Sequence, residues 1–155
     1  MAPYSDQGYG GAVYAESVTV SGSNFASNSV NTTDGFLNTA DGGGVVGVGY
    51  ARIVGSTFAG NRAKDLGGAV AVLDDPSLLK VEDSIFRDNA AAFGGALGND
   101  SSAIEVERSE FDSNTATGIS GGLVHDAGQG GAIWAASSVT LRDATFDGNT
   151  AALVE

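Results

Sequence analysis

Cysteine is absent from this chain of 155 residues, and histidine occurs only once. The chain therefore forms no disulfide and no thiolate metal site, and its redox compartment cannot be read from cysteine use. No apolar run approaches the roughly 18 residues of a membrane-spanning helix. The start of the chain lacks the charged and then apolar layout of a signal peptide. The chain is therefore made without one, or one has been removed or lies outside this segment.

Basic residues are scarce, because 7 Lys and Arg stand against 19 Asp and Glu and give a formal net charge of −12. Nucleic acids and anionic membranes are poor partners for such a chain, since it has few cations to replace their counterions. We therefore expect no nucleic-acid partner and no direct insertion into a membrane. An acidic surface suits solubility, an ionic environment or a basic partner.

Glycine is abundant, with 24 residues, and apolar residues make up 42% of the chain. This apolar fraction is too high for a disordered segment, in which low hydrophobicity and high charge prevent collapse. The glycines do not recur at every third residue, which excludes a collagen triple helix. We therefore expect them at turns, or where two stretches of backbone approach each other closely.

Two short motifs alternate along the chain, and each occurs five times. The first is a Gly-Gly pair followed by a small or β-branched residue and an aliphatic one: Gly10-Gly11-Ala12-Val13, Gly43-Gly44-Val45-Val46, Gly67-Gly68-Ala69-Val70, Gly94-Gly95-Ala96-Leu97 and Gly130-Gly131-Ala132-Ile133. The second is Phe-x-x-Asn: Phe25 and Asn28, Phe58 and Asn61, Phe86 and Asn89, Phe111 and Asn114, Phe146 and Asn149. Self-similarity at such spacing is typical of a solenoid.

Alignment of the five repeats on Phe predicts the type of secondary structure. Apolar residues stand seven and five positions before each Phe: Val18 and Val20, Ala51 and Ile53, Leu79 and Val81, Ile104 and Val106, Val139 and Leu141. Polar residues lie between them, and this period of two indicates strands with one buried face. Because one repeat cannot bury its apolar face alone, the repeats are expected to stack and share a core.

The sequence therefore predicts an all-β fold, a single-stranded right-handed parallel β-helix (solenoid) of about five rungs. Residues 1–155 are expected to form a single β-helix domain. Neither end shows an amphipathic helix or a polar capping repeat, although solenoids normally cover their open ends. We therefore expect an excerpt of a longer solenoid or a subunit of an assembly.

Each repeated residue has an expected structural role. The Gly-Gly pairs turn the chain with positive φ, and the Phe rings stack inside the solenoid. The Asn residues take the left-handed conformation at a corner, and their amides bond the neighbouring rung. Opposite charges alternate in outward columns, as at Asp83, Arg108 and Asp143. These charges favour the register, with a docking surface as the alternative.

The pairing of Gly-Gly-Ala-aliphatic with Phe-x-x-Asn resembles the repeat of the chlamydial polymorphic outer-membrane proteins. It is also similar to repeats of bacterial and algal surface proteins of the pectate-lyase-like β-helix superfamily. The resemblance extends over nearly the whole chain. It implies an extracellular or cell-surface location and a role in adhesion, as in the passenger of an autotransporter, although kinship of fold does not establish function.

Candidate interaction residues stand outside the repeated columns. The segments 29–42 and 115–129 are longer than their counterparts, and extended loops on one side of a solenoid often bind ligands. Phe36 and His125 lie in these segments, whose alternative interpretation is a tolerated surface insertion. Tyr14 and Trp134 share one column directly after the Gly-Gly motif. We expect these rings to point outward and stack on a sugar or a protein, or to form a buried contact under a loop.

Catalytic signatures are missing. Polysaccharide lyases and hydrolases of the β-helix type need clustered Asp, often with Arg or His nearby. Asp74-Asp75 is an isolated pair before Pro76, which is typical of a solvated turn, and His125 has Asp126 beside it but no identifiable nucleophile. Calcium-binding nonapeptides and phosphate-binding loops are also absent. We therefore predict no enzyme activity, no catalytic or metal-binding residue and no cofactor.

Two functions remain open at this stage. The first is a non-catalytic structural or interaction module, either an adhesin-like surface scaffold or a subunit docked in a larger protein assembly. Its partners would be other protein chains, bound through uncapped solenoid ends or corner loops. The second is a carbohydrate-active β-helix, either a fragment of a polysaccharide lyase or hydrolase or a sugar-binding module, which makes carbohydrate a possible partner.

Overall fold

The computed structural model describes residues 8–31, 40–74, 78–101, 103–119 and 128–154. These residues form strands joined by turns and bends, and every strand pair among them is parallel. The described ranges contain no helix that could cross a membrane. The prediction of an all-β solenoid with parallel sheets is therefore confirmed at this level.

The strands form three main sheets and one short pair. The first sheet contains β2 (Val13–Ser21), β5 (Val45–Val54), β7 (Val70–Val72), β8 (Leu78–Glu82), β11 (Leu97–Asn99), β12 (Ala103–Glu107), β15 (Ile133–Ala135) and β16 (Val139–Arg142). The second contains β3 (Asn24–Ala26), β6 (Thr57–Ala59), β9 (Ile85–Arg87), β13 (Glu110–Asp112) and β17 (Thr145–Asp147). The third contains β10 (Ala90–Ala91), β14 (Thr115–Ile119) and β18 (Thr150–Val154), and the pair is β1 (Gly8–Tyr9) with β4 (Ala40–Asp41).

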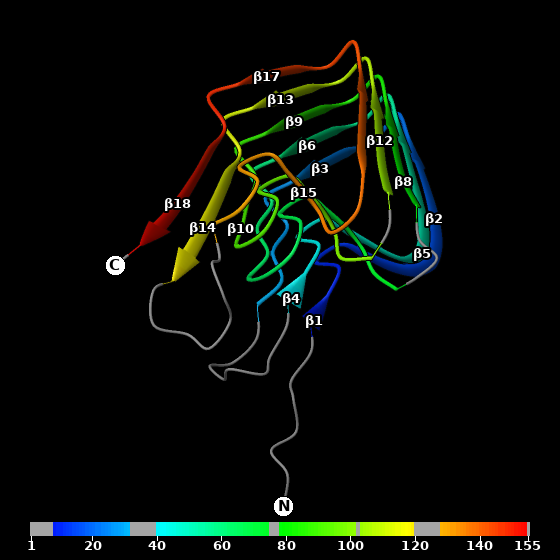
Figure 1. Cartoon of the computed structure of the whole chain (residues 1–155). Helices are drawn as coiled ribbons and strands as arrows, with labels where there is room; N and C mark the ends of the chain where they lie inside the picture. The colour runs from blue at the N-terminus through cyan, green and yellow to red at the C-terminus, as the bar shows by residue number, and fades with distance from the viewer. Residues whose placement is uncertain (1–7, 32–39, 75–77, 102, 120–127, 155) are drawn as a thin grey trace, which may run out of the picture.

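Register between the strands follows the alignment of the repeats. Ala51 pairs with Leu79, Leu79 with Ile104, and Ile104 with Val139. The second sheet stacks its strands in repeat order, so that β3, β6, β9, β13 and β17 form a ladder running from blue to red in Figure 1. We number the repeats first to fifth by the order of these five strands.

The first sheet is built from one strand in some repeats and from two in others. In the second repeat β5 runs without interruption through ten residues, whereas the next repeats use two strands for the same face, β7 with β8 and β11 with β12. Segments 73–77 and 100–102 separate these two strands. Since β5 pairs with both β7 and β8, the face stays one sheet.

A stack of five phenylalanine rings runs through the core. Neighbouring ring centroids lie 4.7–5.0 Å apart, and the ring planes differ by 3–7°. Phe58, Phe86 and Phe111 are buried, together with the aliphatic columns of the first sheet. Offset aromatic stacking stabilises such contacts by about 0.5–1.5 kcal/mol beyond the burial of apolar area. The Phe column therefore packs successive repeats against one another.

The asparagines form a hydrogen-bonded ladder beside the Phe stack. Each Asn from Asn28 to Asn114 donates its side-chain amide to Oδ1 of the Asn in the next repeat, at 2.9–3.0 Å. The same oxygen accepts the backbone N–H of the preceding Asn. The second amide proton bonds the carbonyl of the Phe in the preceding repeat, as from Asn89 to Phe58 at 3.0 Å. One side chain thus joins three successive repeats.

The serines two residues before Phe form a second ladder. The backbone N–H of Ser23 donates to Oγ of Ser56, that of Ser56 to Ser84, and that of Ser84 to Ser109, each at 3.1 Å. Each hydroxyl donates in turn to a carbonyl two residues earlier, as Ser56 does to Val54. The fifth repeat has Ala144 at this position and ends the ladder. No buried side-chain N or O in the described ranges lacks a hydrogen bond.

Two expectations about the corners are wrong. The left-handed residues are not the asparagines but the residues directly before them: Ser27, Gly60, Asp88, Ser113 and Gly148, with φ of 53–65°. The Asn side chain instead points inward, where its amide can reach both neighbouring repeats. The second Gly-Gly motif is also displaced by one residue, because Val13 pairs with Val45 and Gly42 has φ of +64°.

The physical reason for this displacement lies at Gly44. The register places it in the column of Ala12 and Ala69, since each of the three comes directly before a paired valine. A Cβ at Gly44 would lie 2.8 Å from the carbonyl oxygen of Ala69 and 3.4 Å from the ring of Phe58. In the run of three glycines, residues 42 and 43 form the Gly-Gly turn, and Gly44 stands where the neighbouring repeats have alanine.

The outward charge columns are paired only in part. Arg108 bonds Asp83 of the preceding repeat at 2.7 Å and also bonds its neighbour Glu107, while Arg52 bonds Glu82 at 2.5 Å. Lys80 and Glu105 are adjacent in register, but no ion pair joins them in the described structure. Exposed pairs of this kind contribute about 0–1 kcal/mol each, so they bias the register and do not hold the fold.

Candidate interaction surfaces

A second layer of side chains lies against one side of the solenoid. It is built from the residue directly before each Gly-Gly turn: Tyr9, Asp41, Leu66, Phe93 and Gln129. Tyr9 pairs with Asp41 in register, Leu66 with Phe93, and Phe93 with Gln129. The amide of Gly42 donates to the carbonyl of Leu66 and so joins the two halves. We call these five residues the side column.

The side column lies beside the outward residues that stand five positions later in the sequence. These residues are Tyr14, Val46, Ala71, Gly98 and Trp134, which the register aligns across the first sheet. Val46, Leu66 and Ala71 are buried between the two layers, and Tyr9, Leu73, Phe93 and Trp134 pack around them. Small residues are needed in the middle, because a Cβ on Gly98 would lie 2.5 Å from Cγ of Leu66.

Tyr14 and Trp134 lie at opposite ends of this layer. Tyr14 stacks on Tyr9 with a centroid distance of 5.3 Å and keeps 56% of its surface exposed. Trp134 is half-buried against Phe93, also at 5.3 Å, and its indole N–H donates to Oε1 of Gln129 at 3.3 Å. The two rings are separated by the intervening repeats and do not form one site. Phe36 and His125 lie outside the described residues.

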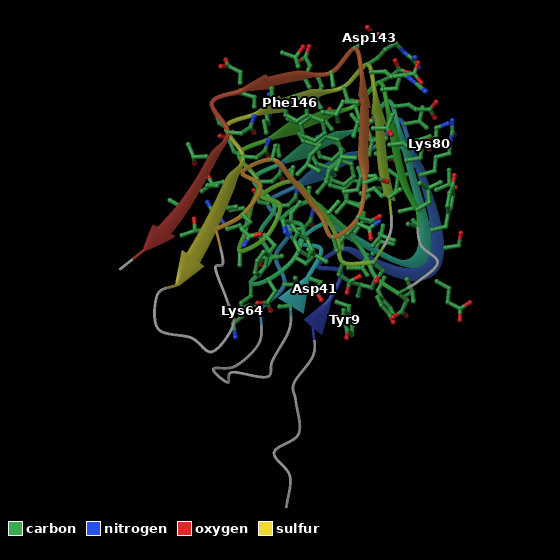
Figure 2. The ribbon with its side chains drawn as sticks, in the orientation of Figure 1. Tyr9, Asp41, Lys64, Lys80, Asp143 and Phe146 are labelled. Atoms are coloured by element: carbon green, nitrogen blue, oxygen red, sulfur yellow. The ribbon has the colours of Figure 1, made fainter. Side chains whose placement is uncertain are left out.

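Asp41 is the one acidic residue of the side column. It is only 6% exposed, and its Oδ1 accepts the backbone N–H of Leu66 at 3.1 Å. Asp65 reciprocates by accepting the N–H of Ala40 at 2.9 Å. Burial, and next the charge of Asp65, raise the pKa of Asp41 to about 7. Burial also raises the pKa of Asp65. Figure 2 shows Tyr9 and Asp41 side by side at this edge.

The last strands present a second candidate surface. Among the exposed large apolar side chains of the described residues, three belong to the fifth repeat: Val139 at 42%, Leu141 at 49% and Phe146 at 42%. Their counterparts in the three middle repeats are buried. Phe146 stacks on Phe111 through one ring face only, and the other face has no aromatic partner in the described structure. Apolar side chains gathered on one face mark an interaction surface.

The acids considered for catalysis are not joined by a catalytic partner in the part of the chain that the structure describes. Asp74 is exposed and has φ of +67°, as expected for a turn residue. Asp75 and Asp126 lie outside the described residues. No group of three or more His, Asp or Glu that could hold a metal ion occurs in the described ranges. A small surface depression lies over β8, β12 and β16, with the mixed charges of Lys80, Glu105 and Arg142 on its walls.

Sequence alignment on Phe missed the side column, because its five residues share no chemical type. The signal was their constant position, one residue before the turn and five before the outward residue of the first sheet. The correct register at Gly42 is needed to see it, since the displaced alignment puts Gly42 in the column instead of Asp41. The exposed face of the fifth repeat follows directly from the aligned columns.

Comparison with known proteins gives a match over one part of the chain. Residues 108–136 match the model of the Chlamydia polymorphic membrane protein repeat. The matched segment begins at Arg108, just before β13, includes Phe111 and Asn114, and ends just after β15. The chain is thus similar to this repeat over a segment that contains both motifs. No curated protein and no solved structure matches the chain.

Proposed function

We propose that this chain is a non-catalytic structural and interaction module built as a single right-handed parallel β-helix of about five rungs. The observation that carries the proposal is the use of the motif residues. The Phe rings, Asn amides and Ser hydroxyls bond or pack against their own kind in neighbouring repeats. The functional groups of the three middle repeats are therefore occupied within the fold and are not free for a ligand.

The right-handed form is favoured because parallel strands joined by crossovers are right-handed in nearly all proteins. Five aligned motifs support about five rungs, and shared ladders support one domain over residues 1–155. The similarity of residues 108–136 to the polymorphic membrane protein repeat supports an adhesin-like scaffold at the cell surface or outside the cell. The alternative setting for the same module is a subunit of a larger protein assembly.

A test of the non-catalytic proposal is incubation of the chain with a panel of acidic and neutral polysaccharides. We expect no release of new reducing or unsaturated ends above that of a heat-denatured sample. The variants Asp74→Ala and Asp126→Ala serve as matched samples, since these residues are the acids weighed for catalysis. Turnover by the native chain that disappears in either variant would contradict the scaffold proposal.

Sugar binding without turnover is the second candidate. It is favoured by the Tyr9–Tyr14 stack, because an exposed aromatic face can pack on a sugar ring. Titration with oligosaccharides, followed by tyrosine fluorescence, is expected to show saturable binding that Tyr14→Ala abolishes and that Ile85→Ala, an exposed residue on β9, leaves unchanged. Equal titration curves for the native chain and Tyr14→Ala would remove this candidate.

A further inference from the structure

The hydrogen-bonded ladders have a direction along the solenoid. In each ladder a repeat donates its Asn amide and its Ser backbone N–H to the side-chain oxygens of the next repeat. The Asn of that next repeat returns one bond to the Phe carbonyl of the preceding repeat. The outer face of the first repeat therefore keeps unused acceptor oxygens, and the outer face of the fifth repeat keeps unused donor groups. The two faces are thus different and complementary.

The first repeat ends with free acceptors. Oδ1 of Asn28 and Oγ of Ser23 accept no hydrogen bond in the described structure, although the corresponding oxygens of Asn61 and Ser56 do. Asn28 also retains an amide proton, since its Nδ2 donates only to Asn61. The missing partners are those that a preceding repeat would supply: an Asn amide, a backbone N–H and a Phe carbonyl.

The fifth repeat ends with the matching donors. Asn149 uses Nδ2 to reach the carbonyl of Phe111, and its second amide proton and its backbone N–H have no acceptor in the described ranges. The backbone N–H of Ala144 lacks the hydroxyl that serves Ser23, Ser56 and Ser84. Beside these donors stand the exposed side chains of Val139, Leu141 and Phe146. Figure 2 shows Phe146 on the final strand layer.

Charge does not oppose contact between these two faces. Residues 8–31 carry a single charged side chain, Glu16, although the whole chain has a net charge of −12. In continued register, Arg142 would stand beside Ser21, Asp143 beside Gly22, and Asp147 beside Ala26. A like-charge contact, which destabilises adjacent strands, is thus avoided where two acidic molecules would meet.

We propose that the face of the fifth repeat binds the first repeat of a second copy of this chain, head to tail. Phe146 stacks on Phe25 of that copy, and Asn149 donates to Asn28. The N–H of Ala144 donates to Ser23, and Leu141 packs against Val20. The two surfaces are different, so the contact leaves a free face at each end of the pair and permits longer arrays. The inference rests on the proposed interaction module and names its partner.

Cysteine cross-linking tests the register, since the chain has no native cysteine. Asn24 and Thr145 are exposed members of one outward column and become neighbours only across the proposed contact. A mixture of the Asn24→Cys and Thr145→Cys chains is oxidised, and the disulfide-linked heterodimer is quantified. The matched control mixes Asn24→Cys with Glu110→Cys, which is exposed in the same column one repeat earlier.

We expect the heterodimer to exceed the control by about tenfold, because docked thiols react at a higher effective concentration than colliding ones. Adding Leu141→Asp to the Thr145→Cys chain is expected to remove the excess, since a carboxylate would then face Val20 of the other copy. Cross-linking equal to the control overturns the inference, as does a Thr145→Cys homodimer in excess of the heterodimer. Neither result bears on the non-catalytic scaffold proposal, which only turnover of a polysaccharide would contradict.

Discussion

The asparagines show at the residue scale why one side chain recurs while its surroundings vary. Asn61, Asn89 and Asn114 have no exposed surface. The side chain of Asn89 makes four hydrogen bonds with three residues: its oxygen accepts two from Asn61, and its amide donates to Phe58 and Asn114. Aspartate lacks the donors, and glutamine has a longer side chain. The carboxamide therefore satisfies buried polar groups that water cannot reach, and leaving such groups unpaired is costly.

Asn89→Ala should destabilise the chain by about 3–5 kcal/mol, because it leaves several buried donors and acceptors unpaired at about 1–3 kcal/mol each. Asn61 loses the acceptor of two bonds, and Phe58 loses the donor to its carbonyl. The measurement is urea unfolding followed by circular dichroism. Asn24→Ala is the control, since Asn24 is exposed, and its cost should stay within about 0.5 kcal/mol. Equal costs for the two variants would show that the ladder does not stabilise the fold.

Asp41 is the residue whose ionisation should make stability depend on pH. Its folded pKa of about 7 lies above the ordinary 3.8, so the folded chain keeps this proton while the unfolded chain loses it. The contribution of Asp41 to the free energy of unfolding is therefore fully present below pH 4 and is lost as the pH rises towards 7. The loss approaches roughly 4 kcal/mol, from about 1.4 kcal/mol per pKa unit.

Asp41→Asn tests this directly, because asparagine has the shape of the protonated acid and does not ionise. We expect the melting temperatures of the two chains to agree near pH 4 and the variant to melt higher at pH 8. Asp74→Asn, at an exposed turn, is the control, and its melting temperature should differ from that of the native chain by the same amount at pH 4 and pH 8. A constant difference for Asp41→Asn from pH 4 to pH 8 would mean that the carboxyl does not titrate in this range.

At the scale of elements, the turns and strands show which features of the fold sequence reasoning could reach. Register was predictable at Phe, Asn, Ser and the aliphatic columns, because these residues touch their own kind in the next repeat. The positions of the left-handed residues at the corners were not predictable, since Ser27, Gly60 and Asp88 share only a tolerance for positive φ. The side column escaped for a similar reason: Tyr9, Asp41 and Leu66 occupy one position with three chemistries.

Gly68→Ala should be strongly destabilising, even though Gly68 does not have positive φ. A Cβ there would overlap the carbonyl oxygen of Gly95 and lie 2.6 Å from the backbone of Ala90, so two repeats would have to separate. Gly49→Ala is the matched control, because a Cβ at Gly49 would lie 3.8 Å from its nearest atom. Thermal melts should show a large loss for Gly68→Ala and little change for Gly49→Ala. Similar melting temperatures for both would exclude close packing of the turns.

At the scale of the whole molecule, the repeats form a nearly one-dimensional array in which each contacts its neighbours. Stability in such arrays is the sum of repeat and interface terms, and it declines towards the ends. The middle repeats hold the buried Phe, Asn and Ser residues, whereas the fifth repeat exposes the same columns. The outer faces are therefore the natural places for interaction, and the interior explains why the motifs recur.

Residue-resolved amide hydrogen exchange tests the ladder architecture most directly. We expect the backbone N–H groups of Asn61, Asn89 and Asn114 to exchange only through global unfolding, because each donates to the side-chain amide oxygen of the Asn in the next repeat. Exposed Gly148 and other residues of the fifth-repeat corner should exchange faster. Rapid exchange at the three asparagines in the folded chain would contradict the Asn ladder, since the repeats would then not be joined by these hydrogen bonds.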